Sequence, residues 1–113
     1  MKSPIVTLTT DFGYTVPWAG IMKGVMLSIN PALVLVDLTH EVPPQDIMSG
    51  ALALADSLPF FPPGTIHLAV VDPGVGSKRR PIVVKTAKSY FVGPDNGLFW
   101  PAFERWGGLE KAW

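Results

Sequence analysis

Two patterns of hydrophobic residues alternate along this chain, and they predict a series of short strands and helices. Runs rich in β-branched residues that end at turn formers predict strands, whereas apolar residues three or four positions apart predict helices. We expect strands at residues 5–9, 33–38, 65–71, 81–85 and 90–92, and helices at 19–29, 47–58 and 98–105. The last residues, 109–113, are expected to begin a further extended segment.

The order strand–helix–strand–helix–strand predicts an α/β fold, in which helices cover a mainly parallel sheet through right-handed crossovers. Residues 81–92 are expected to add a hairpin at one side of this sheet. The run 33–38 is apolar at every position except Asp37, so we expect this strand to be covered on both faces.

Composition and charge narrow the classes of function. The chain has 113 residues, which is enough for about one domain, and 48% of them are hydrophobic. The formal net charge is zero, so the basic surplus that nucleic acids or anionic membranes attract is missing. The absence of cysteine excludes disulfides, thiolate metal sites and cysteine nucleophiles. No apolar run has the length of a signal peptide core or a membrane span, so we expect a cytoplasmic protein without membrane or nucleic-acid partners.

The end of the sequence lacks the signals that usually close a domain. After Gly107-Gly108, residues 109–113 read as the first half of a strand and stop at Trp113 without a turn. We therefore expect residues 1–113 to be a partial domain.

Polar residues follow several of the predicted strands. Asp11 follows the first strand, His40 lies just beyond the second, Asp72 follows the third, and Asp95-Asn96 follow the fifth. Parallel strands place their carboxyl ends at one edge of a sheet, where ligands bind in open α/β folds. We therefore expect an acidic crevice at this edge, and such a crevice suits a cationic substrate.

Each of these residues also has a structural interpretation. The Asp11 side chain either closes a local turn or contacts a ligand. Asn96 either adopts positive φ in a turn or holds a substrate with its amide. The segment 68–80 is either a tight turn with a basic tip or a catalytic loop. We favour purely structural roles for four other residues. We expect Asp37 to hold the backbone of a neighbouring loop and Asp46 to cap a helix, and we expect His40 and His67 to be structural histidines.

Familiar catalytic patterns are missing from the sequence. No phosphate-binding glycine loop or nucleophile elbow follows a strand, and the aspartates are not spaced as in a known calcium loop. The two histidines are far apart in the sequence and there is no cysteine, so a zinc site is not indicated. We expect no metal and no cofactor.

Six motifs in order resemble the N-terminal domain of the S-adenosyl-L-methionine (SAM) hydroxide adenosyltransferases, a family similar in fold to the SAM-dependent fluorinase and chlorinase. They are T-L-T-T-D-F-G (7–13), M-K-G (22–24), V-D-L-T-H (36–40), F-P-P-G-T-I-H (61–67), V-V-D-P-G-V-G-S-K-R-R (70–80) and P-D-N-G (94–97).

This resemblance implies attack of water or hydroxide on C5′ of SAM, which gives adenosine and methionine with SAM as substrate and no cofactor. Asp72 and Arg79 match the family's catalytic aspartate and arginine, with Arg80 as the alternative one residue along. Asp11 matches the carboxylate that holds the ribose, and Trp18 lies in the segment used near the methionine part. With Asn96, these are the expected substrate-binding residues. A carboxylate at Asp72 disfavours halide as the nucleophile.

The chain departs from the family at three places. Val16 stands where the family usually has an aspartate. The catalytic histidine belongs to a motif near T-F-H-G-R-D, downstream of P-D-N-G, which this sequence does not contain. The C-terminal β-barrel is also absent, although the resemblance implies a homotrimer with SAM between an N-domain and a neighbour's barrel. We therefore expect little or no turnover by residues 1–113 alone. The alternatives are a non-catalytic or split module that needs a complementing chain and, less favoured, a metal-dependent hydrolase.

Overall fold

A mixed sheet of six strands, in the order β2-β1-β3-β5-β4-β6, organises the part of the chain that the structure describes. The structure is a computed structural model and describes residues 3–72 and 80–113. The strands are β1 (Ile5–Thr10), β2 (Val34–Thr39), β3 (Thr65–Val70), β4 (Pro81–Thr86), β5 (Ser89–Pro94) and β6 (Leu109–Ala112). The helices are α1 (Trp18–Ile29), α2 (Ile47–Ser57) and α3 (Trp100–Trp106), with a 3₁₀ turn, η1 (Leu58–Phe60), after α2.

The pairing of the strands confirms a mainly parallel α/β fold with an added hairpin. Strands β2, β1, β3 and β5 are parallel neighbours. The hairpin of β4 and β5 is antiparallel and places β5 against β3, so its second strand extends the parallel part of the sheet. The predicted extended segment at the end of the chain is β6, which pairs with β4 at the edge of the sheet.

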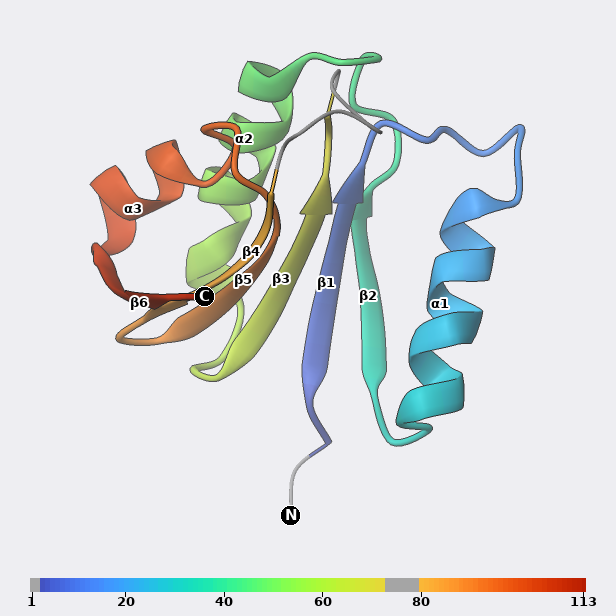
Figure 1. The fold of residues 1–113 in the computed structure, drawn as a ribbon, viewed down its shortest axis with the longest axis horizontal. Coiled ribbons are helices and arrows are strands. Elements are labelled where there is room, and N and C mark those ends of the chain that lie inside the picture. The colour runs from blue at the N-terminus through green and yellow to red at the C-terminus, as the bar shows by residue number, and fades with distance from the viewer. Residues whose placement is uncertain (1–2, 73–79) are drawn as a thin grey trace.

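The core lies between the sheet and the two helices α2 and α3, which Figure 1 shows together on one side of the molecule. Leu54 and Phe91 are fully buried there, with Phe99 and Ala102 beside them. Asp46 caps α2, because its side chain accepts a hydrogen bond of 3.1 Å from the Ser49 N–H, as the sequence predicts. The hydrogen bond from the Ser49 hydroxyl, together with this one, lowers the pKa of Asp46 below its usual value.

The expectation that the second strand is covered on both faces is wrong. Strand β2 is the outermost strand beside β1, and Val34 is 45% exposed. An apolar run shows that its residues favour burial, but it does not show whether the strand will lie at the centre or at the edge of the sheet.

Helix α1 stands beyond β2, away from α2 and α3 (Figure 1). Its apolar stripe is largely uncovered: Ile21, Val25 and Ile29 are exposed, and Ala19 is its buried residue. None of the helices in the described ranges is long and apolar enough to cross a membrane.

Candidate functional site

The carboxyl ends of the four parallel strands meet at one edge of the sheet, as the sequence predicts for the first three. Residues Thr39, Thr10, Val70 and Pro94 end β2, β1, β3 and β5 in that spatial order. Strand β4 runs the other way, so Arg80, directly before it, lies at the same edge. The edge therefore gathers the residues that directly follow β1, β2, β3 and β5.

Asp11 and Asp72 follow neighbouring strands at this edge. Thr10 is paired with Val70 in the sheet, so Asp11 is level with Val71 and Asp72 lies one residue further along. Adjacent strands are about 4.8 Å apart, which makes these two acidic residues neighbours across the strand ends. Asp11 is half-buried, and so is Asp72.

Asp11 does not make the local turn that one reading of the sequence gives it. Thr10 makes that turn, because its Oγ1 accepts the Phe12 N–H at 3.2 Å. Asp11 Oδ2 instead accepts the backbone N–H of Gln45 at 2.8 Å. This bond anchors one carboxylate oxygen to the loop that follows β2.

Gln45 is a residue that sequence reasoning missed. Its φ of 64° lies in the left-handed region, which a residue with a side chain adopts at a cost. This backbone geometry accompanies the N–H bond to Asp11. Its signal in the sequence is faint, because Pro43-Pro44 predict a loop but nothing marks Gln45 as its special position.

Asn96 uses its side-chain amide to hold the backbone next to Asp72. Its Nδ2 donates to the Val71 carbonyl at 2.9 Å, and its Oδ1 accepts the Leu98 N–H at 3.1 Å. The positive φ expected for Asn96 belongs instead to Gly97, at 88°. In this arrangement Asn96 positions the strand end that carries Asp72.

Of the two candidate arginines, Arg80 lies in the part of the chain that the structure describes. Arg79 lies outside the described residues. Arg80 is exposed at the start of β4, and its carbonyl accepts the Asp95 N–H at 3.0 Å. This bond joins Arg80 to the loop after β5.

Trp18 begins α1 and is 58% exposed. Its ring meets the Phe12 ring edge-on, with centroids 5.8 Å apart. Because Phe12 directly follows Asp11, this contact brings Trp18 into the neighbourhood of the loop after β1.

Asp37 does not hold a neighbouring backbone, contrary to expectation. Its carboxylate accepts hydrogen bonds from Lys23 Nζ at 2.6 Å and from His40 Nε2 at 2.7 Å. Burial acts to raise the pKa of Asp37, but the hydrogen bonds and charges of Lys23 and His40 outweigh it and lower the pKa. His40 is fully buried in a hydrogen-bonded network, as a structural histidine is.

His67 lies away from this edge, within the sheet and next to Phe61 and Phe91. It is fully buried, with Nδ1 2.7 Å from Thr7 Oγ1. Burial lowers the pKa of His67 to about 4, so the ring is neutral at pH 7. This environment agrees with the structural role expected for His67.

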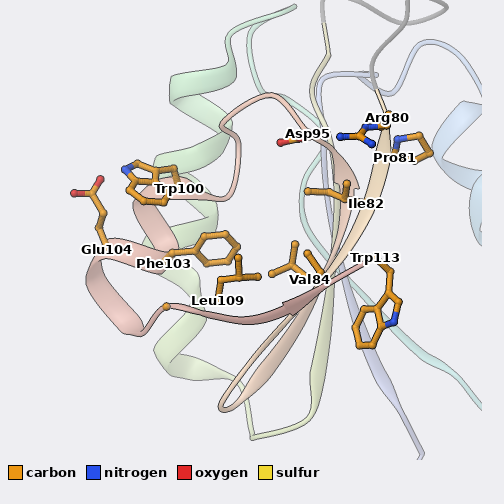
Figure 2. A pocket seen from close by; sticks show the side chains of 12 residues that line it. Arg80, Pro81, Ile82, Val84, Asp95, Trp100, Phe103, Glu104, Leu109 and Trp113 are labelled. Carbon is orange, nitrogen blue, oxygen red and sulfur yellow. The ribbon is translucent and has the colours of Figure 1, made fainter.

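A groove of about 740 Å³ lies between α3 and strands β4 and β6. Figure 2 shows Arg80 and Asp95 at its upper end, with Leu109 and Trp113 further down. Its walls are largely apolar, with Ile82, Val84 and Phe103 among the lining residues. Within the described ranges, no group of three or more histidine, aspartate or glutamate side chains is arranged to hold a metal ion.

Residues 6–113 match the family described as the SAM hydroxide adenosyltransferase N-terminal domain. The chain belongs to this family. The match covers more than half of the chain, and it includes the strand ends that carry Asp11, Asp72 and Asn96.

Known relatives share both sequence and fold with this family member. An (R)-S-adenosyl-L-methionine hydrolase from Methanocaldococcus jannaschii is 46% identical over 108 residues, which cover 91% of this chain and 41% of the relative. A fluorinase from Actinoplanes sp. is 28% identical over 131 residues, covering 96% of this chain and 44% of the relative. The crystal structure of a conserved hypothetical protein from Thermus thermophilus superposes with a TM-score of 0.89 at 41% identity, covering 96% of this chain and 45% of that one. The chain thus spans less than half the length of these relatives.

Proposed function

We propose that this chain is the N-terminal, water-activating part of a SAM hydrolase that forms adenosine and L-methionine. The observation that carries the proposal is the placement of Asp11 and Asp72 after neighbouring parallel strands, in a chain that belongs to the SAM hydroxide adenosyltransferase family. The hydrolase from M. jannaschii, at 46% identity, supports hydrolysis over halogenation, since the fluorinase is only 28% identical.

The proposed reaction is a single displacement at C5′ of SAM. An oxygen of water forms a bond to C5′ while the C5′–S bond breaks and its electron pair returns to sulfur. The sulfonium becomes a neutral thioether, so the leaving group needs no proton, and the proton of water passes to a base or to solvent. The protein must chiefly hold water in line with the C–S bond.

Asp72 is the residue we propose for orienting the attacking water. Its carboxylate accepts a hydrogen bond from water and disfavours a halide ion at the same place. Arg79, or Arg80 one residue along, is proposed as its cationic partner. The resemblance implies a catalytic histidine in a motif that this sequence does not contain, and we propose that such a motif completes the set.

Two residues are proposed to bind the substrate, and a third to support their site. Asp11 has one carboxylate oxygen anchored by Gln45, and the other suits a ribose hydroxyl. Trp18, exposed near Phe12, suits the methionine end, and Asn96 supports the site through the Val71 carbonyl. We further propose that the complete enzyme is a cytoplasmic homotrimer that needs no metal, as the family resemblance implies.

The decisive experiment compares two proteins. One is the chain of 113 residues, and the other is the same chain continued by the C-terminal part of the M. jannaschii relative. Each is incubated with SAM, and adenosine is followed by chromatography. We expect adenosine from the longer protein and little or none from the shorter one. Absence of adenosine with both proteins contradicts the proposal, and robust adenosine from the short chain contradicts the need for a further segment.

The same assay tests Asp72. In the longer protein, Asp72→Asn is expected to lower the rate by at least about a hundredfold, the usual scale of a positioned acid or base. Asp95→Asn, which changes an exposed carboxylate at the same edge, is the matched control and is expected to retain activity. An unchanged rate in Asp72→Asn removes this residue from the mechanism.

A second candidate function is a non-catalytic module that needs a complementing chain. The apolar groove beside β4 and the exposure of all four β6 residues favour it, because proteins usually cover such a sheet edge. Mixing the short chain with a separately produced C-terminal part tests this candidate: restored adenosine formation supports it. A third candidate, a metal-dependent hydrolase, predicts loss of activity on adding a chelator.

A further inference from the structure

Four side chains form a continuous hydrogen-bonded relay from α1 to the end of β1. Lys23 on α1 donates to Asp37 Oδ2 at 2.6 Å, and Asp37 Oδ1 lies 2.7 Å from His40 Nε2. His40 Nδ1 lies 2.7 Å from Thr10 Oγ1. The relay thus joins a helix, two strand ends and the loop after β2.

The ionised carboxylate fixes the direction of two of these hydrogen bonds. Asp37 only accepts, so Lys23 Nζ and His40 Nε2 both donate to it. Thr10 Oγ1 accepts the Phe12 N–H and also shares a hydrogen bond with His40 Nδ1. The cation of Lys23 keeps Asp37 ionised and in place. Every polar atom of the His40 ring therefore has a partner that matches it.

The sequence Thr10–His40–Asp37 has the order of a nucleophile, a base and an orienting acid, but burial excludes nucleophilic catalysis. Thr10 and His40 are both fully buried, so a substrate has no access to the Thr10 hydroxyl. A nucleophile must reach the reacting carbon of its substrate. The relay therefore has a positioning role.

The relay holds the loop that carries Asp11. The Gly13 N–H donates to the His40 carbonyl at 2.7 Å, and the Val42 N–H donates to the Thr10 carbonyl at 3.3 Å. The Tyr14 ring meets the His40 ring edge-on, with centroids 5.5 Å apart. Together with the Gln45 bond to Asp11, these contacts connect residues 10–14 to the loop after β2.

We propose that Lys23, Asp37 and His40 are positioning residues that hold the Asp11–Gly13 loop in the geometry that binds the ribose of SAM. This inference rests on the proposed function. The relay acts on Asp11, while the water is assigned to Asp72 on the next strand. Breaking the relay therefore weakens substrate binding and leaves the chemical step nearly unchanged.

The test uses three variants that break or preserve the relay. Lys23→Met removes the cation at a partly exposed position, where loss of folding is not expected, and Asp37→Asn removes the charge while it keeps the shape. Lys23→Arg keeps a cation for Asp37 and serves as the conservative variant. Lys88→Met, an exposed lysine in the β4–β5 turn, is the matched control.

The kinetic measurement is made on the longer protein that turns over SAM. We expect Lys23→Met and Asp37→Asn to raise KM about tenfold with kcat within about twofold, the scale of one lost hydrogen bond to a charged group. Lys23→Arg and Lys88→Met are expected to retain the original KM. An unchanged KM in both relay-breaking variants overturns the inference, and so does a fall of kcat without a change of KM.

Amide hydrogen exchange on the chain of 113 residues separates this inference from the proposed function. Breaking the relay is expected to speed exchange at the N–H groups of Gly13 and Gln45, whether or not SAM is turned over. Unchanged exchange at both amides overturns the relay's hold on the loop. A third outcome is faster exchange in the relay variants while the longer protein makes no adenosine. This result contradicts the proposed SAM hydrolase function. It shows that the relay holds the loop, and it overturns the assignment of the relay to ribose binding.

Discussion

The side-chain amide of Asn96 donates a hydrogen bond of 2.9 Å to the backbone carbonyl of Val71, the residue before Asp72. This contact spans two neighbouring strands, because Val71 follows β3 and Asn96 follows β5. Asn96 is also tied to Leu98 through its Oδ1. The position of Asp72 thus depends on a loop that is distant in sequence.

Asn96→Ala is expected to lower the free energy of unfolding by about 1–2 kcal/mol, because the Val71 carbonyl and the Leu98 N–H lose their partner. Urea denaturation followed by fluorescence measures this change. Asp95→Asn is the control and is expected to stay within about 0.5 kcal/mol, since Asp95 is exposed. Equal stability of Asn96→Ala and the original chain contradicts the proposed support of the strand end.

The buried ring of His67 predicts how stability changes with pH. Its pKa is about 4 in the folded chain and near 6.5 in the unfolded chain, so the unfolded chain binds more protons between these values. The free energy of unfolding therefore falls as pH decreases from about 6.5 to about 4, by about 3 kcal/mol in total from this group. Denaturant unfolding at a series of pH values measures the slope.

The variant His67→Gln provides the comparison, because it keeps a polar partner for Thr7 but does not titrate. Its unfolding free energy is expected to depend less on pH in this window than that of the original chain. A direct NMR titration of the His67 ring gives a second measurement. A ring pKa near 6.5 in the folded chain contradicts the prediction.

Gly93 is expected to tolerate no side chain. A Cβ at this position meets the Ala69 carbonyl oxygen at 2.3 Å and Phe99 Cζ at 2.8 Å. Because the interior is close-packed, Gly93→Ala is expected to lower the free energy of unfolding by about 1–3 kcal/mol. In contrast, Gly20→Ala in the exposed part of α1 meets no atom within 4 Å and is expected to gain up to about 1 kcal/mol. Thermal melts of the two variants should move in opposite directions.

The exposed stripe of α1 is expected to contribute little to the stability of the chain. Ile29 is 81% exposed, so Ile29→Ser is expected to change the free energy of unfolding by less than about 0.5 kcal/mol. Leu54 is fully buried between α2 and the sheet, so Leu54→Ala is expected to cost about 2–5 kcal/mol. Similar losses in both variants contradict the arrangement of α1 beyond β2.

Several features of the candidate site follow directly from the pattern of residues. Strand runs that end in Asp11, Asp72 and Asp95-Asn96 alternate with helical segments, and parallel strands joined by helices must place their carboxyl ends at one edge. The shared edge, the hairpin and the cap at Asp46 were therefore predictable. These features depend on local periodicity and on chain direction, which the sequence contains.

Other features depend on contacts between segments that are distant in sequence. The bond from Gln45 to Asp11 spans 34 residues, and the bond from Asn96 to Val71 spans 25. The same holds for Asp37, whose partner Lys23 comes from another element. Hydropathy and propensity describe what each residue prefers, but they do not specify which group will meet it.

By itself, the sequence determined the order of strands and helices, the α/β class and the acidic residues that converge at one sheet edge, because periodicity and chain direction are local properties. Only the tertiary structure decided that β2 is an edge strand, that α1 leaves its apolar stripe exposed, and that Asp37 and His40 form a relay to Thr10. These outcomes depend on which surfaces pack together and which hydrogen-bond donors then face which acceptors, and both depend on the fold of the whole sheet.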